Sequence, residues 1–560
     1  MLRVRWLGRV PYGEAHALQQ ALQSGSRDDY VLLLEHPPVF TLGVRGDPAH
    51  ILVDPADVGA EVVRTDRGGD VTFHGPGQLV VYPVVTVPRG HESGPAHVEA
   101  VEQVAIDALA DFGLAAGRLA GYPGVWVEPH GPRPRKIAAV GVRISRDRSL
   151  HGLALNVDPD LGWFDRIVPC GITDKAVTSM AAEGFEESME SVVDAVARAA
   201  AVWWSRGGPV DRQDVHHARR SLPAAIGEAR PAPLEGRPGK SGESPLRVRL
   251  RQARVDLEAA EAVPARKPEW LRVQARMGPE FHALRRTLRS HGLVTVCEEA
   301  GCPNIFECWA EGTATFMING ERCTRACGFC LVDTRHPGPV DAEEPDRVAA
   351  ATARLGLAHV VVTGVARDDL PDGGAGAFAA TVEAVRRRCP GTAVEILVPD
   401  CKGSSGALEV LLGARPDVFN HNLETVARLQ RAVRPSAGYA RSLAVLASAK
   451  SAGLTAKSGL ILGMGESEEE VVGALADLAG VGVDIVTLGQ YLRPTAAHVP
   501  VARWWTPEEF GRLAEIGRSM GFAHVQSSPL TRSSYHARGA AAAAGSRSGA
   551  APVAFSGTGR

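Results

Sequence analysis

Residues 297–330 read CEEAGCPNIFECWAEGTATFMINGERCTRACGFC and hold six of the chain's nine cysteines. These form two sets of three, spaced C-x4-C-x5-C and C-x3-C-x2-C. Cysteines a few residues apart can turn their sulfurs toward one point, so each set can bind a metal ion or a cluster. A disulfide framework fits poorly in a long chain without a secretory signal. Zinc is an alternative, although a structural zinc site takes four protein ligands, whereas three thiolates suit a 4Fe-4S cluster.

The downstream set, Cys323, Cys327 and Cys330, matches the motif of the radical S-adenosylmethionine (SAM) enzymes, and the aromatic Phe329 also fits that family. This resemblance implies a 4Fe-4S cluster with one iron free of cysteine. In the family, that open iron chelates S-adenosyl-L-methionine, and one electron from the cluster cleaves SAM to a 5′-deoxyadenosyl radical.

The upstream set, Cys297, Cys302 and Cys308, makes the whole stretch resemble lipoyl synthase. In that family the upstream cysteines bind an auxiliary 4Fe-4S cluster whose sulfides enter the product. Its fourth ligand is a serine in an RSSY motif. Residues 532–535 of this chain read RSSY, so the resemblance assigns that role to Ser534.

Strand-like and helix-like segments alternate after the cysteines, which predicts a parallel sheet. We expect strands at 313–318, 359–363, 394–398, 417–420, 457–462 and 484–488, with a helix at 376–388 among those between them. Six such units would form the open (β/α)6 partial TIM barrel of the lipoyl synthase fold. Sites on such sheets gather at the carboxyl ends of the strands. The segments expected to line the SAM cavity are 361–374, 420–424, 433–435 and 459–466.

The first 222 residues are expected to form a separate α/β domain. Strands are predicted at 30–34, 136–144 and 151–157, and an amphipathic helix at 97–112,. Residues 67–78 (RGGDVTFHGPGQ) contain five Gly or Pro, which favours a shaped loop over a long element,. Glycine lets backbone N–H groups approach a ligand closely, although such a loop is more often a plain turn.

Cys170 is the only cysteine before residue 297. A lone cysteine is usually a small buried hydrophobic residue. The alternative is a nucleophile for acyl groups, whose thiol pKa a nearby lysine ammonium such as Lys136 would lower. That role requires Lys136 and Cys170 to meet in space.

The motifs RGGDVTFHGPGQ, KIAAVGVRI, HGLALNVD and PCG, in this order, resemble lipoyl(octanoyl) transferase over essentially all of residues 1–222. The resemblance implies the mixed α/β fold of biotin and lipoate protein ligases. It places the acyl-thioester nucleophile on Cys170 and the lysine that tunes it on Lys136. Val168 stands where the family more often has asparagine. The implied acyl-pocket residues are Arg67, Gly68, Gly69, Asp70, Val71, Thr72, Phe73, His74, Ala139, Val140, Gly141, Gly152, Leu153 and Ala154.

Composition restricts the partners and the compartment. The net charge of −3 argues against strong bulk attraction to nucleic acid, and no apolar run is long enough for a membrane span,. Without a signal peptide, we expect a reducing cytoplasm. Cys389 and Cys401 match neither cysteine set and are expected to be structural.

Three further boundaries follow from composition. Residues 223–265 are rich in Pro, Gly and Arg and are predicted to be a linker, with a short helix at 246–263,. Residues 266–540 are expected to form the radical SAM domain. Residues 541–560 are of low complexity and are predicted to be a disordered tail,.

Together the two resemblances imply a bifunctional enzyme of lipoate biosynthesis. It would transfer octanoyl from acyl carrier protein to lipoyl domains of 2-oxoacid dehydrogenases or the glycine cleavage H protein. It would then insert two sulfurs, with electrons from a flavodoxin- or ferredoxin-type donor. For the first half, alternatives are an ATP-dependent lipoate or biotin ligase, or a docking module. For the second, they are another sulfur-inserting radical enzyme, such as biotin synthase, or an iron–sulfur carrier.

Overall fold

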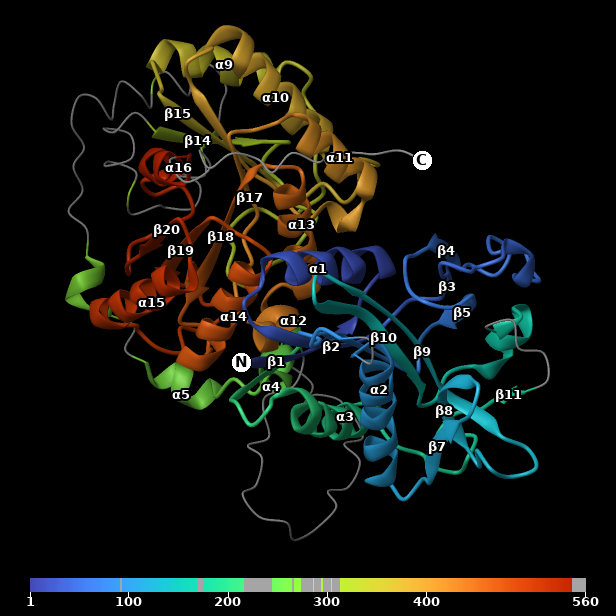
Figure 1. The fold of residues 1–560 in the computed structure, drawn as a ribbon. Helices are drawn as coiled ribbons and strands as arrows, with labels where there is room; N and C mark the ends of the chain where they lie inside the picture. The colour runs from blue at the N-terminus through green and yellow to red at the C-terminus, as the bar shows by residue number, and fades with distance from the viewer. Residues whose placement is uncertain are drawn as a thin grey trace. The chain divides into compact units, whose positions relative to one another are not determined.

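The computed structural model describes residues 1–90, 93–169, 175–215, 244–263, 266–272, 286, 294–295, 304 and 313–545. The chain forms two compact units, the first of which spans residues 1–215. The mixed α/β unit and the parallel barrel-like unit that the sequence predicted are both present (Figure 1). None of the helices in the described ranges is both long and apolar enough to cross a bilayer.

The first unit is built on a large mixed sheet with the strand order β12-β1-β2-β6-β10-β9-β8-β7, and β11 pairs with β9. A small sheet, β4-β3-β5, lies beside it in the same unit. The strands are β1 Leu2–Arg9, β2 Asp29–Glu35, β3 Val39–Leu42, β4 Glu61–Arg64, β5 Val71–His74, β6 Gln78–Val84, β7 Ala116–Leu119, β8 Tyr122–Val127, β9 Arg135–Ser145, β10 Arg148–Asn156, β11 Ala176–Val177 and β12 Val210–Asp214.

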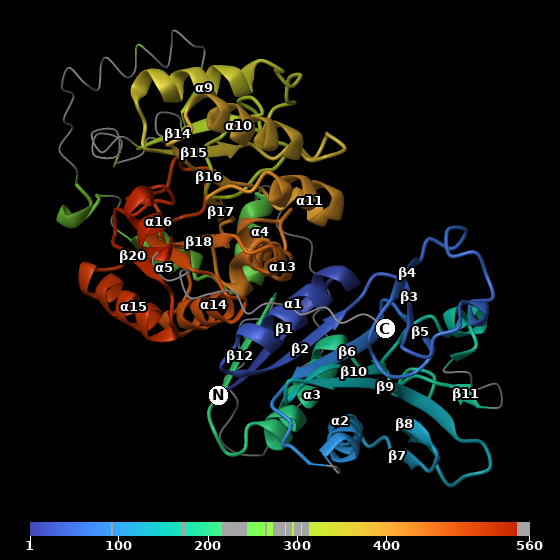
Figure 2. The ribbon, with the colours of Figure 1, turned by 45° about the horizontal axis from the view of Figure 1, so that its top comes forward.

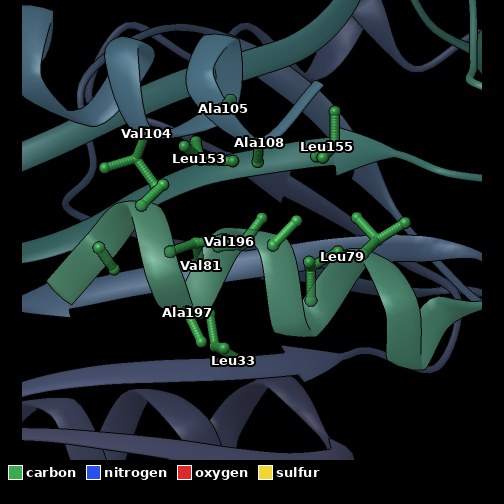
Figure 3. Packing of buried hydrophobic residues seen from close by; sticks show 14 of the residues in the cluster. Leu33, Leu79, Val81, Val104, Ala105, Ala108, Leu153, Leu155, Val196 and Ala197 are labelled. Carbon is green, nitrogen blue, oxygen red and sulfur yellow. The ribbon is translucent and has the colours of Figure 1, made fainter. Parts of the chain in front are cut away.

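Three helices cover the large sheet: α1 Tyr12–Gly25, α2 Ser93–Ala110 and α3 Met189–Trp204. Apolar side chains of α2 and α3 pack into one cluster with residues of β2, β6 and β10, as Figure 3 shows around Leu33, Val81 and Leu153. The helix α1 lies on the other face of the sheet (Figure 2). It buries Ala15, Leu18 and Leu22 at three- and four-residue spacing, as an amphipathic helix does,. Short 3-10 turns are η1 Pro48–His50 and η2 Leu161–Arg166.

The second unit is organised around an open sheet whose described strands pair in the order β13 to β20. All neighbours from β14 to β20 are parallel, and only β13 runs antiparallel. The strands are β13 Val294–Thr295, β14 Thr313–Ile318, β15 His359–Gly364, β16 Ala393–Leu397, β17 Val418–Asn420, β18 Thr455–Leu462, β19 Ile485–Gln490 and β20 His524–Ser527. The six predicted strands are present, and β20 is a parallel strand that was not predicted.

Helices alternate with these strands, as expected for β/α units. They are α9 Glu344–Leu355, α10 Ala375–Arg388, α11 Ser405–Gly413, α12 Gln430–Val433, α13 Tyr439–Ser451, α14 Glu468–Gly480 and α15 Pro507–Met520, with η5 Cys401–Gly403 and η6 Ala427–Leu429. Capping boxes begin α14 and α15, so both N-termini have their first backbone N–H groups satisfied,.

Two segment boundaries differ from the prediction, although the helix expected at 246–263 is present as two short helices. Residues 245–262 belong to the second unit as α4 Pro245–Gln252 and α5 Leu257–Ala262, followed by η4 Glu269–Leu271. Leu250 is fully buried, and Arg249 donates to the carbonyl of Ala432 at 3.2 Å, so this stretch packs as part of the barrel unit rather than as a tether. Of the predicted linker, residues 223–243 and 264–265 lie outside the described residues.

The predicted disordered tail also begins too early. Residues 537–545 form α16 Ala537–Gly545, beside β20 in Figure 1. Ala540 and Ala544 are buried in a cluster with Val418 and Ile485, the first residues of β17 and β19. The alanine-rich helix is therefore stabilised by contact with the amino ends of the strands. Residues 546–560 lie outside the described residues.

Candidate functional sites

A pocket in the first unit gathers three segments that are far apart in the sequence. Of the fourteen predicted acyl-pocket residues, ten line it: Arg67, Gly69, Thr72, His74, Ala139, Val140, Gly141, Gly152, Leu153 and Ala154. Residues 139–141 and 152–154 are adjacent because β9 and β10 pair antiparallel, with Gly141 opposite Gly152. A side chain at Gly141 would lie 2.8 Å from the carbonyl oxygen of Gly68, so glycine allows the 67–74 segment to approach β9.

The other four predicted residues do not line the pocket. Residues 71–74 form the strand β5 instead of an irregular loop, so their side chains alternate between two faces,. Thr72 and His74 face the pocket, whereas Val71 and Phe73 pack into a hydrophobic cluster on the other side. Phe73 stacks on Trp163 with ring centroids 4.8 Å apart.

Asp70 and Gly68 have structural partners. Asp70 accepts a hydrogen bond from the Asp47 backbone N–H at 3.0 Å and contacts the His50 ring at 2.5 Å. The backbone N–H of Gly68 donates to the carbonyl of Val142 at 3.2 Å. Both residues therefore connect the 67–74 segment to its neighbours.

The structure adds aromatic and histidine residues to the pocket that were not among the predicted acyl-pocket residues. Tyr12, Tyr82 and His151 also line it. His74 bonds Gln78 through Nδ1 at 2.8 Å, and burial lowers the pKa of the His74 imidazole well below its ordinary value. These rings come from α1, β5, β6 and β10, so only the assembled unit brings them together.

Lys136 is buried next to an aromatic ring: its ammonium lies 4.8 Å from the centroid of Trp126. Cys170 lies outside the described residues, so its distance to Lys136 stays a prediction. The chain on either side of Cys170 is held in place. The backbone N–H of Val168 donates to the carbonyl of His50 at 2.8 Å, and that of Thr178 donates to the carbonyl of Lys136 at 2.9 Å.

Cys323, Cys327 and Cys330 lie on the loop that follows β14, at the carboxyl edge of the parallel sheet. Several backbone hydrogen bonds fix this loop. The N–H of Cys323 donates to the carbonyl of Asp333 at 2.8 Å, and the N–H of Gly328 donates to the carbonyl of Val433 at 2.8 Å. His498 contacts the carbonyl of Cys330 at 2.9 Å. The loop is thus held by segments 433–435 and 498–499. Of these two segments, only 433–435 was predicted from the sequence to line the SAM cavity.

Arg325 connects the cysteine loop to two other strand ends. Its guanidinium donates to both carboxylate oxygens of Asp368 at 2.8 Å and lies 2.6 Å from Asp400. Asp368 belongs to the 361–374 segment, which follows β15. The hydroxyl of Thr324 also donates to the carbonyl of Ala366 at 2.9 Å. Asp368 is therefore engaged with the cysteine loop, whereas Asp369 pairs with Arg367 of its own segment.

The chemistry of this loop suits a metal cluster. Burial raises the pKa of the Cys327 thiol and raises that of Cys330 to about 12. Thiolates in such surroundings are costly unless cationic metal centres compensate their charge. Three cysteines on one short loop fit a cluster that takes three cysteine ligands,.

The segments that carry Ser534 and the upstream cysteines are in contact at one described residue. Asn304, which lies between Cys302 and Cys308 in sequence, donates from Nδ2 to the carbonyl of Leu530 at 2.6 Å. Next to Ser534, the hydroxyl of Ser533 hydrogen-bonds with Asn422, which follows β17. Cys297, Cys302 and Cys308 themselves lie outside the described residues.

The remaining predicted segments occupy the carboxyl ends of their strands. Glu466 follows β18 and accepts hydrogen bonds from the Met464 backbone N–H at 3.0 Å and from the Trp505 ring at 2.9 Å. Burial raises the pKa of Glu466. Cys401 is buried in η5 and Cys389 is partly buried at the end of α10, and both are free thiols.

Three family models match the chain. Residues 11–201 match the lipoyl protein ligase A/B catalytic domain. Residues 242–302 match the N-terminal domain of lipoyl synthase of the radical SAM family, and residues 317–478 match the radical SAM superfamily. The match at 242 begins just before α4, in agreement with the packing of that helix.

Two lipoyl synthases agree with the models that match the second part of the chain. A lipoyl synthase of Rubrobacter xylanophilus is 56% identical over 273 residues, which cover 48% of this chain and 85% of that protein. A lipoyl synthase of Mycolicibacterium paratuberculosis is 52% identical over 296 residues, 53% of this chain and 94% of that protein. A bi-partite lipoate protein ligase structure from Thermoplasma acidophilum is 17% identical, covers 38% of this chain and 86% of that chain, and has a TM-score of 0.33. The chain therefore belongs to the lipoyl synthase family, and its first unit carries a lipoyl protein ligase A/B catalytic domain.

Proposed function

We propose that this chain carries out two consecutive steps of protein lipoylation. The first unit would transfer octanoyl from acyl carrier protein to a lysine of a lipoyl domain. The second would insert sulfur at C6 and C8 of that octanoyl group. The observation that carries the proposal is the presence, in one chain, of a ligase A/B catalytic domain and a lipoyl synthase. Covalent linkage raises the effective concentration of the second site for a shared substrate.

In the proposed transfer, the Cys170 thiolate attacks the thioester carbonyl, the C–S bond to the carrier protein breaks, and the carrier-protein sulfur leaves as a thiolate. The neutral ε-amine of the acceptor lysine then attacks the octanoyl-enzyme. A C–N bond forms, the C–S bond to Cys170 breaks, and one N–H proton passes to the departing thiolate. Lys136 would hold Cys170 as a thiolate. This is supported by the hydrogen bond from the backbone N–H of Thr178, eight residues after Cys170, to the carbonyl of Lys136.

In the proposed sulfur insertion, Cys323, Cys327 and Cys330 would hold the 4Fe-4S cluster that binds S-adenosyl-L-methionine. When bound, this group supplies the radical that unactivated C–H bonds require. Arg325 and His498 would keep the cysteine loop in place. Cys297, Cys302, Cys308 and Ser534 would hold the second 4Fe-4S cluster, which is consumed as a sulfur substrate. The contact between Asn304 and Leu530 supports this grouping.

The proposed partners follow from these steps. They are octanoyl acyl carrier protein, lipoyl domains of 2-oxoacid dehydrogenases or the glycine cleavage H protein, and a flavodoxin- or ferredoxin-type electron donor. A reducing cytoplasm is the proposed compartment, because free thiols and iron–sulfur clusters persist there.

The test is the intact mass of a lipoyl domain after anaerobic incubation with the reconstituted chain and octanoyl acyl carrier protein. Without SAM, we expect an octanoyl adduct, and with SAM and a reductant, a further gain of two sulfurs. Cys170→Ala should abolish the first change, and Cys327→Ala only the second. If Cys170→Ala stays active and the reaction instead needs free octanoate and ATP, the first unit is a ligase.

A further inference from the structure

A buried histidine–aspartate pair lies at the pocket of the first unit. His151, in β10, lines the pocket and is 1% exposed. Its Nε2 lies 2.6 Å from a carboxylate oxygen of Asp66, which precedes Arg67 in sequence. Arg143 pairs with the other oxygen of Asp66. Neither Asp66 nor His151 belongs to the acyl-pocket residues that the motifs indicated.

The aspartate determines which ring nitrogen of His151 carries the proton. A carboxylate only accepts hydrogen bonds, so Nε2 must donate. The bonds from His151 and Arg143 keep the pKa of Asp66 below its ordinary value, although burial alone would raise it. Burial lowers the pKa of His151 to about 4, so the ring is neutral at pH 7. With its one proton on Nε2, Nδ1 presents a lone pair.

That lone pair has no donor among the described residues. Nδ1 of His151 is buried, and no polar group in the resolved ranges reaches it. A buried acceptor without a partner costs about 1–3 kcal/mol. Such a group in a pocket wall is satisfied when a bound molecule supplies an N–H or O–H group.

The backbone at His151 also adopts an uncommon conformation. His151 has a backbone φ of 59°, in the left-handed region, which is uncommon for a residue with a side chain,. Its backbone N–H donates to Gln19 at 2.7 Å, and its ring stacks on His16 with centroids 5.4 Å apart. Strain that the surroundings maintain in this way is typical of functional positions.

We propose that His151, oriented by Asp66, accepts a hydrogen bond from the ε-amino group of the acceptor lysine and directs it toward the activated acyl carbon. The proposal rests on the proposed acyl transfer, but not on the form of the activated acyl group. An amine attacks the carbonyl carbon with its lone pair. Its N–H groups therefore remain available to donate a hydrogen bond to a fixed acceptor. His151 lines the pocket that the octanoyl chain would occupy, and its buried Nδ1 is such an acceptor.

A matched pair of substitutions tests the position of the acceptor. The amide oxygen of asparagine can take the place of histidine Nδ1, and asparagine tolerates positive φ. His151→Asn therefore keeps an acceptor at the Nδ1 position, whereas His151→Gln directs its NH2 group to Asp66 and places no amide oxygen at the Nδ1 position. Asp66→Asn can donate to Nε2, which would move the ring proton to Nδ1 and turn the acceptor into a donor. His16→Gln is the control, because His16 lies 3.6 Å from the same Asp66 oxygen without setting the tautomer.

The assay separates acylation from transfer in the full chain. Octanoyl-enzyme is formed from octanoyl acyl carrier protein and followed by intact mass, and a lipoyl domain is then added for a single turnover. Because His151 lines the pocket that would hold the acyl chain, the readout is the transfer rate of each variant relative to its own acylation rate. Transfer should fall about 10- to 100-fold in His151→Gln and Asp66→Asn, the loss for one hydrogen bond to the reacting group. It should fall less than threefold in His151→Asn and His16→Gln.

Several results would overturn the proposal. One is equal transfer by His151→Gln and His151→Asn, and another is acylation that falls in parallel with transfer. A loss in His16→Gln as large as in His151→Gln would favour a divalent metal bound by His16, Asp66 and His151, whose ligand atoms lie within 4.8 Å of one another. If the wild-type chain forms no octanoyl-enzyme, that result refutes the proposed thioester route but does not test the role of His151. The same variants are then compared with octanoyl-adenylate as the acyl donor, where the same ranking is required.

Discussion

Replacing Arg325 with methionine should destabilise the second unit strongly. The Arg325 side chain is 5% exposed, and it is paired with Asp368 at 13% and Asp400 at 0% exposure. Methionine fills similar space but removes the cation paired with Asp368 and leaves Asp400 with only the Arg441 guanidinium, 3.9 Å away. Breaking a buried pair by removing one partner costs about 3–5 kcal/mol. The same loop offers a matched control, Arg322→Met, which removes an ion pair to Asp333 between side chains 44% and 31% exposed. An exposed pair contributes about 0–1 kcal/mol.

Hydrogen exchange measured by mass spectrometry on the cluster-free chain reports the second unit separately from the first. Peptides from β15 to β17 should lose about 3 kcal/mol of protection in Arg325→Met and less than about 1 kcal/mol in Arg322→Met. Iron retained after reconstitution should fall in the same order, because Arg325 lies between two of the three cysteines. Adding Asp400→Asn to Arg325→Met should recover part of the loss, since it removes one poorly compensated charge. Equal protection in the two single variants would refute the reasoning.

Three further predictions concern other parts of the chain. Burial lowers the pKa of His36 from 6.5 to about 4, so the unfolded chain binds its proton first, and stability should decline as pH falls from 6.5 to 4,. Denaturant titrations of His36→Gln should show that decline reduced by about 3 kcal/mol, and an unchanged pH slope would contradict it. Ser534→Cys should slow sulfur insertion, because thiolate releases iron less readily than serine; unchanged single-turnover kinetics would exclude a labile serine ligand. Ala540→Leu should cost about 1–3 kcal/mol in thermal or denaturant unfolding, because Ala540 is 1% exposed against Val418 and Ile485; a neutral effect would mean that α16 is loosely seated,.

Local patterns predicted most of the barrel strands. Apolar runs such as 313–318 and 359–363 stand between helical segments, and the strands found there differ by at most two residues at either end. The strand β20 escaped prediction because His524–Ser527 is polar and only half-buried. The helix α16 escaped for a related reason. Alanine side chains offer little apolar area, so nothing in the local pattern marks the face that α16 buries.

The sequence by itself determined the spacing of the cysteines and, through a family resemblance, the three segments that line the pocket of the first unit. The cysteine spacing can be read directly because it is a short-range feature of the chain. Only the tertiary structure decided which residues of 67–74 face the pocket, because β5 alternates between two sides. It alone brought His151 to Asp66, 85 residues away in sequence, and Asn304 to Leu530, 226 residues away. Contacts at such separations depend on how whole layers pack, and no local pattern carries that information.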